Sequence, residues 1–235
     1  MPNDATTPNS TALLTDMYEL TMVEAAMASG AAQRESVFEV FSRRLPAGRR
    51  YAVVAGTARV LDAVENFRFG PGEIDFLHAA KVVGDETLDY LREYRFTGDI
   101  TGYAEGECFF PGSPLLTVRG TFADAVMLET VILSIYNHDC AVAAAASRMT
   151  TAAHGRPCLE MGARRTHEWA AVGAARAAVV GGFTGSSVLE AGRSHGIRTI
   201  GTAAHSFTLL HDTEADAFDA QVAALGADTT LLVDT

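Results

Sequence analysis

Short apolar segments alternate with single helix-like segments throughout the second half of the chain, and this alternation constrains the fold more than any other feature. The apolar segments cover residues 157–162, 181–185, 198–204 and 229–235, and the helix-like segments between them cover 166–180, 187–195 and 213–225. Apolar segments that do not alternate strictly with polar residues are typical of parallel strands covered by helices. The pattern therefore predicts a parallel α/β sheet.

The first half of the chain has a different order of elements, which predicts an α+β domain. Its expected elements are a helix from about Thr15 to Gly30, a strand over 36–42, a loop with four arginines over 43–51, helices over 52–67, 73–80 and 85–94, and short β segments over 98–118. A long alanine-rich helix over 123–150 comes next. We therefore expect a flexible tail over residues 1–10, an α+β domain over 11–120 and an α/β domain over 121–235.

Polar residues gather directly after the predicted strands, whereas the opposite strand ends carry mainly turn residues. In parallel α/β folds, ligands bind at the carboxyl ends of the strands. Several loops that converge on one point favour a barrel over an open sheet. About four βα units are visible where a closed barrel needs roughly eight strands, so we expect the first half of a barrel. The alternative is an open sheet with 229–235 as its edge strand.

Composition excludes several classes of function. The 18 basic and 29 acidic residues give a net charge of −11, which argues against a chain-wide nucleic-acid-binding surface. Three widely separated cysteines suggest neither a disulfide framework nor a zinc site. The polar N-terminus lacks the apolar core of a signal peptide, and no apolar run approaches the roughly 18 residues of a membrane helix. We therefore expect a cytoplasmic protein without a membrane partner.

Two of the strand-end loops carry groups suited to anions. Arg164 and Arg165 offer planar forks for a carboxylate or phosphate. Because helix N-termini prefer acidic residues, this pair favours a binding role over an ordinary exposed basic pair. The next loop, with Gly182, Ser186 and Ser187, could hold a phosphate through backbone N–H groups. On the residues alone, ordinary turn and N-cap chemistry explains that loop better.

His205 lies just past the third predicted strand, close to Thr202. A histidine at such a place can act as a general base, a phosphoryl acceptor or a metal ligand. A histidine satisfied in the core is an equally good interpretation. Asp234, at the end of the last predicted strand, could bind Mg²⁺ or a hydroxyl group. No residue is assigned as a metal ligand.

Several segments resemble a known enzyme family. They are TALLTDMYELTM (11–22), FEVFSRRLPAGRRYAVVAG (38–56), GYAEGECFFPGSPLLTVRG (102–120), LETVILSIYNHD (128–139), EMGARRTHE (160–168), GTAAHSFTLLHD (201–212) and LLVDT (231–235). Together they resemble the nicotinate phosphoribosyltransferases, in particular the bacterial ones, from about residue 11 to the last residue. The most specific segments are LLTDxYELTM and GTxAHSF.

The resemblance implies both a fold and a reaction. The fold is an α+β domain followed by the first half of a parallel α/β barrel of the type II phosphoribosyltransferase kind. The reaction joins nicotinate and phosphoribosyl pyrophosphate (PRPP) to give nicotinate mononucleotide and pyrophosphate, in the salvage route to NAD. It is of the ligase type, uses ATP hydrolysis and Mg²⁺, and takes place in a homodimer with the active site at the interface.

The resemblance also implies roles for single residues. His205 is the histidine that ATP phosphorylates, and Tyr18 stacks on the nicotinate ring, often across a dimer interface. Thr202 lies at the nicotinate site, and Arg164 and Arg165 lie near the anionic groups of the substrates. An aromatic face suits a pyridine ring and an arginine fork suits its carboxylate.

The chain departs from the family in two respects. Val188 replaces the asparagine that usually follows the paired small residues of the second loop. Family members are also much longer, and an isolated half-barrel would expose apolar faces and a strand edge, which predicts aggregation or obligate association. Two alternative functions stay open: a non-catalytic short form that binds nicotinate or a partner chain, and another type II enzyme that acts on quinolinate or nicotinamide.

Overall fold

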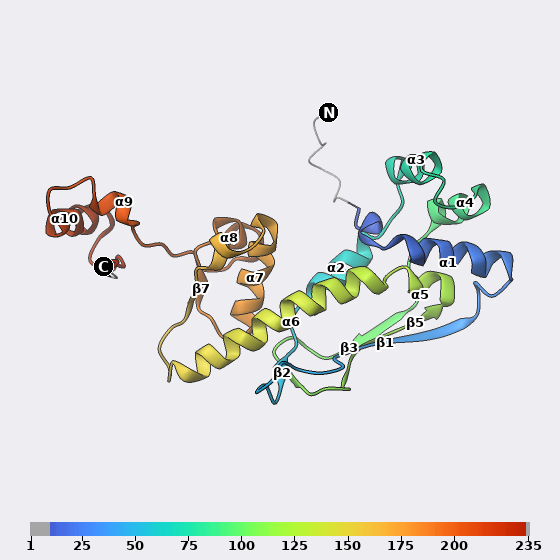
Figure 1. Cartoon of the computed structure of the whole chain (residues 1–235), viewed down its shortest axis with the longest axis horizontal. Coiled ribbons are helices and arrows are strands. Elements are labelled where there is room, and N and C mark those ends of the chain that lie inside the picture. Colours follow the sequence, from blue (N-terminus) through green and yellow to red (C-terminus); the bar gives the residue numbers. More distant parts are fainter. Residues whose placement is uncertain (1–9, 234–235) are drawn as a thin grey trace. The chain divides into compact units, whose positions relative to one another are not determined.

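The computed structural model describes residues 10–233, which form two compact units (Figure 1). Unit 1 contains residues 10–156 and 177–183, and unit 2 contains residues 157–176 and 184–233. The division therefore lies elsewhere than the boundary expected at residue 120. The long helix after residue 120 packs on the strand β2 (Ala52–Val53) and the helix α2 (Thr57–Glu65) of the first unit, so it belongs to that unit. Of the expected tail, residues 1–9 lie outside the described residues, and Ser10 donates a hydrogen bond to the carbonyl of Arg68.

Unit 1 begins with a short 3₁₀ helix, η1 (Ala12–Leu14), and the helix α1 (Met17–Ala28). A capping box starts α1, because the Asp16 side chain accepts from the N–H of Glu19 while the Glu19 side chain accepts from the N–H of Asp16. The chain leaves the helix through Gly30, whose φ of +73° suits glycine. The expected helix between Thr15 and Gly30 is confirmed.

An antiparallel sheet of β1 (Glu35–Phe41), β5 (Pro114–Thr121) and β3 (Asp99–Gly102), in the order β1-β5-β3, forms the centre of unit 1. Val118 on the middle strand faces Phe38 on one side and Ile100 on the other. Val118 is buried, and Phe38 and Ile100 pack against the same hydrophobic core. The expected strand at 36–42 and the β segments at 98–118 are confirmed.

The helix expected over 52–67 starts later than predicted. Ala52–Val53 form strand β2, which pairs with β4 (Cys108–Phe109), and α2 covers only Thr57–Glu65. Gly56 separates the two elements with a φ of +101°, and a Cβ there would lie 2.9 Å from a methyl carbon of Ile135. Glycine tolerates both this conformation and this close approach, and α2 begins directly after it.

The helices α3 (Pro71–Ala79) and α4 (Asp85–Glu93) match the expected helices at 73–80 and 85–94. The single helix expected over 123–150 is instead two helices, α5 (Phe122–Val126) and α6 (Glu129–Ala152). The break falls at Met127 and Leu128, which are both completely buried in the core. Burial of these two side chains explains why the apolar pattern runs across the break without interruption. In Figure 1, α6 runs alongside the strands of the sheet.

Unit 2 contains the parallel strands β6 (Leu159–Glu160) and β7 (Gly185–Ser186). A parallel bridge joins Ser186 to Thr199, so a third segment extends the sheet in chain order. The expected parallel pairing is confirmed, although the strands are much shorter than predicted. The helical elements are η2 (Gly162–Arg165), α7 (Glu168–Val180), which continues into unit 1, α8 (Leu189–His195), α9 (His205–Thr208) and α10 (Glu214–Leu225).

The last predicted strand, over 229–235, is wrong as far as the structure describes it. Residues 229–233 are not in a strand, and the Gln221 side chain of α10 donates to the hydroxyl of Thr229 and to the carbonyl of Thr230. A strand needs a neighbour with which to pair, and within residues 10–233 none pairs with this segment. Residues 234–235, with the candidate Asp234, lie outside the described residues.

The fold class is therefore a mixed α/β architecture, with an antiparallel sheet in unit 1 and short parallel strands alternating with helices in unit 2. No helix within residues 10–233 is both long enough and apolar enough to span a membrane.

Candidate functional site

The carboxyl ends of three parallel segments meet at one edge of unit 2. Ser186 pairs with Glu160 on one side and with Thr199 on the other, so the loops that follow these residues leave the sheet in the same direction. These loops hold five of the eight candidate site residues, namely Arg164, Arg165, Ser187, Thr202 and His205, and a sixth candidate, Ser186, is the last residue of β7. The other two candidates, Tyr18 and Gly182, belong to unit 1.

A carboxylate joins the first two of these loops. The Ser186 hydroxyl donates a 2.7 Å hydrogen bond to Glu160 Oε2, and the backbone N–H of Gly162 donates to Oε1. The N–H of Ser187 donates to the carbonyl oxygen of Glu160 at 2.9 Å. The Ser186 hydroxyl also accepts a 3.0 Å bond from the N–H of Val188. Glu160 therefore fixes the beginning of the arginine loop relative to the serine loop.

The two serines differ in what they can offer a ligand. Ser186 is completely buried, and both its hydroxyl and its N–H have partners within the chain. Ser187 is half-buried, and its N–H is engaged by Glu160. A phosphate contact from this turn therefore depends on the Ser187 side chain rather than on Ser186.

Arg164 and Arg165 form the last turn of η2 and are both exposed. Within residues 10–233, neither guanidinium has an ion-pair partner. A planar, always charged guanidinium in this state can bind a carboxylate or phosphate through two parallel N–H bonds. The sequence predicted that this pair follows the carboxyl end of a strand. This is confirmed, because the two arginines lie four and five residues after the end of β6.

Thr202 and His205 follow the bridge at Thr199. The segment 201–204 is irregular, and His205 is the first residue of α9, with an exposed side chain. The rings of Phe207 and His211 contact each other at a tilt of 60°, with centroids 4.9 Å apart, which helps to hold the turn that His205 begins. An accessible imidazole in a segment that follows a parallel strand can exchange protons or accept a phosphoryl group.

Gly182 ends α7. Its φ is +100°, its N–H donates to the carbonyl of Val179 at 2.9 Å, and a Cβ in its place would lie 3.0 Å from a methyl carbon of Thr150. These contacts show that Gly182 terminates α7 and that a larger residue there would crowd Thr150. Its backbone N–H is thus already used within unit 1.

Tyr18 is the second residue of α1, and its side chain is 45% exposed. Partial burial raises the pKa of the Tyr18 hydroxyl above its usual value, a hydrogen bond with Thr130 opposes this rise, and the Glu129 and Glu19 carboxylates add to it. The ring therefore lies close to the start of α6 with part of its surface open. An exposed aromatic ring on a rigid helix can stack on a planar ligand.

Glu19, the next residue, joins the starts of two helices. Its side chain is completely buried and accepts from the N–H of Thr130 at 2.8 Å and from the N–H of Asp16 at 3.2 Å. Burial raises the pKa of its carboxyl, and these hydrogen bonds oppose the rise. Sequence analysis missed this residue, because only the local bond to Asp16 belongs to a recognisable capping pattern.

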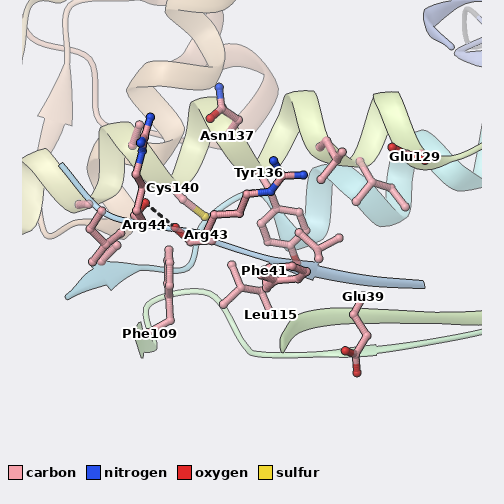
Figure 2. Close-up of a pocket in the computed structure, with 18 of the residues that line it drawn as sticks. Glu39, Phe41, Arg43, Arg44, Phe109, Leu115, Glu129, Tyr136, Asn137 and Cys140 are labelled. Atoms are coloured by element: carbon pink, nitrogen blue, oxygen red, sulfur yellow. Dashed lines mark hydrogen bonds between the residues drawn. The ribbon is translucent and has the colours of Figure 1, made fainter. Parts of the chain in front are cut away.

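A groove of about 870 Å³ in unit 1 was also missed. It lies between α6 and the strands β1 and β5, and Figure 2 shows Phe109 and Leu115 across from the helix residues Tyr136, Asn137 and Cys140. Three arginines of the loop after β1 line it, Arg43, Arg44 and Arg49. An apolar lining with nearby guanidinium groups suits a molecule that has both an apolar part and an anionic group. The four arginines were visible in the sequence, but not their place beside α6.

The described residues do not form a metal cage, since no three histidine, cysteine, aspartate or glutamate side chains among them are grouped closely enough to hold a metal ion. The Mg²⁺ expected from the resemblance therefore does not fit a protein-only site in the described part of the chain. Mg²⁺ is commonly held by substrate phosphates together with one or two carboxylates. The three cysteines are free.

Comparisons with known proteins show which family the chain is similar to. The family model described as the nicotinate phosphoribosyltransferase (NAPRTase) N-terminal domain matches residues 13–137. The nicotinate phosphoribosyltransferase pncB1 of Mycobacterium tuberculosis is 59% identical over 231 residues, which cover 95% of this chain and 51% of the relative. The nicotinate phosphoribosyltransferase of Bacillus subtilis is 35% identical over 228 residues, which cover 97% of this chain and 46% of the relative. The chain thus spans about half the length of the curated relatives it matches.

Solved structures show the same likeness. The human nicotinic acid phosphoribosyltransferase matches with a TM-score of 0.76 and 31% identity, over 83% of this chain and 40% of the human chain. The nicotinate-nucleotide pyrophosphorylase of Pyrococcus furiosus also matches with a TM-score of 0.76, over 100% of this chain and 54% of that chain, but at 22% identity, so it shows the fold alone. Because the family model covers more than half of the chain, the chain belongs to the nicotinate phosphoribosyltransferase family.

Proposed function

We propose that this chain is part of an enzyme that joins nicotinate to PRPP, giving nicotinate mononucleotide and pyrophosphate with hydrolysis of ATP. The observation that carries the proposal is that Arg164, Arg165, Thr202 and His205 all lie in segments that follow the carboxyl ends of the parallel strands of unit 2. Ligands bind at that edge in parallel α/β folds. The names of the similar proteins support the transfer of a phosphoribosyl group to nicotinate, and this reaction would serve the synthesis of NAD.

Nicotinate offers a flat ring and a carboxylate, and the chain has groups that suit both. Across the proposed dimer interface, the exposed ring of Tyr18 would stack on the pyridine, and a fork from Arg164 or Arg165 would bind the carboxylate. Thr202 would contact nicotinate through its exposed hydroxyl. These contacts would place the pyridine nitrogen for attack on the ribose carbon of PRPP, where positioning supplies much of the rate.

The leaving group is pyrophosphate, which needs donors and positive charge as it departs. In the turn after β7, the Ser187 hydroxyl is the proposed phosphate donor, with Gly182 and Ser186 shaping the chain on either side of the turn. Mg²⁺ would be bound mainly by the phosphate oxygens of PRPP, and it would neutralise part of their charge.

ATP would act through His205. An imidazole nitrogen attacks the terminal phosphorus of ATP, ADP leaves, and later hydrolysis of the phosphohistidine releases phosphate and restores the histidine. Coupling this hydrolysis to the transfer would favour product formation. The exposed position of His205 at the start of α9 supports such a role, because the nucleotide must reach the ring.

We also propose that unit 2 is the first half of a parallel α/β barrel of the type II phosphoribosyltransferase kind, and that the enzyme works as a cytoplasmic homodimer with its active site at the interface. The parallel order of β6, β7 and Thr199 supports the barrel, and the free cysteines agree with a reducing compartment. Exposed large side chains in unit 2, such as Trp169 and Leu209, support association with further protein surface.

The test is a rate measurement on the longest natural form of the protein that carries this chain. Nicotinate and PRPP should give nicotinate mononucleotide, and ATP should increase its yield. The variant His205→Ala should keep a basal rate and lose the ATP stimulation, while His154→Ala, which alters a histidine outside the strand-end loops, should behave as the unchanged protein. Full ATP stimulation in His205→Ala would refute the role of His205.

A further inference from the structure

The Glu19 carboxylate accepts two hydrogen bonds, one at the N-terminus of each of two different helices. Its Oε2 accepts from the N–H of Asp16 at the beginning of α1, and its Oε1 accepts from the N–H of Thr130 in the first turn of α6. The two helices are also joined by the Thr130 hydroxyl, which donates to Asp16 Oδ2 at 3.2 Å. One completely buried carboxylate therefore fixes the beginning of α1 against the beginning of α6.

Tyr18 lies at this junction, directly before Glu19 in the chain. Its ring is partly exposed and lies near the first turn of α6, where Glu129 and Thr130 are located. A side chain on the first turn of a helix takes its position from the direction in which that helix begins. Any change in how α1 meets α6 therefore moves the Tyr18 ring.

We infer that Glu19 is a positioning residue for Tyr18, holding the exposed ring at a fixed place above the start of α6 so that it is ready to receive a planar ligand. The inference rests on the proposed function for the identity of that ligand, nicotinate. A ring held in place before binding loses less conformational freedom when the ligand stacks on it, and so binds it more tightly. Glu19 touches no ligand itself, because it is completely buried.

A second glutamate on α1 provides a matched control. Glu24 also forms a hydrogen bond at the start of another helix, α4. Its two carboxylate oxygens lie 3.2 Å and 3.1 Å from the backbone nitrogen of Gly84, whose N–H donates to them. The helix α4 carries none of the candidate site residues. Glu24→Gln thus removes a comparable helix-capping charge from the same helix without touching the junction at Tyr18.

Glutamine is a sharp substitution at position 19. It has one acceptor oxygen where glutamate has two, so one of the N–H groups of Asp16 and Thr130 would face an NH₂ group. In the longest natural form of the protein, Glu19→Gln should raise the KM for nicotinate about threefold and leave kcat and the KM for PRPP unchanged. Glu24→Gln should change neither KM. Tyr18→Ala should raise the KM for nicotinate roughly tenfold, because it removes the ring.

The decisive comparison is the double variant Tyr18→Ala/Glu19→Gln. If Glu19 acts through Tyr18, the double variant has the same KM for nicotinate as Tyr18→Ala alone. An equal effect of Glu19→Gln in both backgrounds, or an effect no larger than that of Glu24→Gln, overturns the inference and leaves the proposed function intact. If Tyr18→Ala does not change the KM for nicotinate, the role of Tyr18 in the proposed function fails, and the inference fails with it.

If the Glu19→Gln variant does not fold, a second variant tests the same hydrogen bond between Glu19 and Thr130. Thr130→Pro removes the N–H that donates to Glu19, and proline is tolerated in the first turn of a helix. Its reference is Thr130→Val, which removes the hydroxyl and keeps the N–H. A higher KM for nicotinate in Thr130→Pro than in Thr130→Val supports the inference, and equal values overturn it.

Discussion

The Ser186 hydroxyl lies 2.7 Å from Glu160 Oε2, and this hydrogen bond joins two loops that hold candidate site residues. The bond is at the carboxyl edge of the parallel strands, where the arginine loop and the serine loop begin. Ser186 is completely buried there, whereas its neighbour Ser187 is half-buried. Two adjacent serines therefore differ in their surroundings: the Ser186 hydroxyl is engaged within the chain, and Ser187 is the serine that we propose contacts a ligand.

Substitution of the two serines separates these tasks. Ser186→Ala should lower the free energy of unfolding by about 1–3 kcal/mol, because it removes a buried donor from the Glu160 carboxylate and an acceptor from the N–H of Val188. Ser187→Ala should change stability by less than about 0.5 kcal/mol and raise the KM for PRPP. Urea unfolding and initial rates measure the two effects. The reverse pattern would show that Ser186 is the ligand contact.

The ion pair between Arg59 and Asp139 predicts a large stability effect in unit 1. Asp139 is completely buried, and one guanidinium nitrogen of Arg59 lies 2.7 Å and 2.9 Å from its two oxygens. Arg59→Leu leaves this buried carboxylate with only its hydrogen bond to His138 Nδ1, at 2.9 Å, among the side-chain contacts that the structure gives it. Loss of one partner of a buried pair costs about 3 kcal/mol or more.

The reference for that experiment is Arg92→Leu, which breaks the exposed pair between Arg92 and Asp89 on α4. Exposed pairs of this kind contribute roughly 0–1 kcal/mol. Urea unfolding of the two variants should therefore differ by at least about 2 kcal/mol. Equal losses of stability would mean that the Arg59–Asp139 pair is as solvated as the surface pair.

The raised pKa of the buried Cys140 thiol leads us to expect that the stability of the protein depends on pH. Burial raises the pKa of its thiol to about 11 from a usual value of 9.0. As the pH rises from 9 towards 11, the thiol ionises in the unfolded chain while it stays protonated in the folded one. The folded state therefore loses stability in that interval, and the contribution is fully present below pH 9.

The measurement compares the unfolding free energies of the unchanged protein and of Cys140→Ala between about pH 8 and pH 10.5. The advantage of the unchanged protein should shrink as the pH rises, because the variant has no thiol to ionise at this position. Cys108→Ala, which alters an exposed cysteine, should show no such trend. A difference that stays constant with pH would contradict the burial of the Cys140 thiol.

Unit 2 exposes large apolar side chains, which predicts association. Leu209 is 83% exposed and Leu210 is 79% exposed, next to the helix that His205 begins. Contiguous exposed apolar residues of this size typically mark protein–protein surfaces or cause aggregation. The double variant Leu209→Ser/Leu210→Ser should shift the sedimentation of the protein towards smaller species, and the control Leu13→Ser should leave it unchanged. Equal sedimentation of the two variants would show that these leucines are not in the contact.

The elements whose position depends on neighbouring residues could be predicted from the sequence. The start of α1 follows from Asp16 and Glu19, three residues apart, and its end from Gly30. The parallel order in unit 2 follows from the alternation of strands and helices, which also placed the arginine pair and His205 after strands. Such patterns lie within a few residues of one another, so they are visible in the sequence.

The rest depends on contacts between distant residues. Ala52–Val53 became a strand because it pairs with Cys108–Phe109, and no local pattern shows this. The bond from Thr130 to Glu19 joins residues 111 positions apart, and the bond from Ser186 to Glu160 joins residues 26 positions apart. The groove beside α6 likewise depends on how the arginine loop meets a helix about ninety residues later.

A product assay with three pyridine substrates tests the proposed reaction most directly. The longest natural form of the protein is incubated with PRPP, ATP and Mg²⁺ and with nicotinate, nicotinamide or quinolinate, and the mononucleotide and pyrophosphate are measured. We expect nicotinate to give mononucleotide and pyrophosphate in equal amounts, much faster than the other two pyridines do. Preferential turnover of nicotinamide or quinolinate, or binding of nicotinate without any turnover, would contradict it.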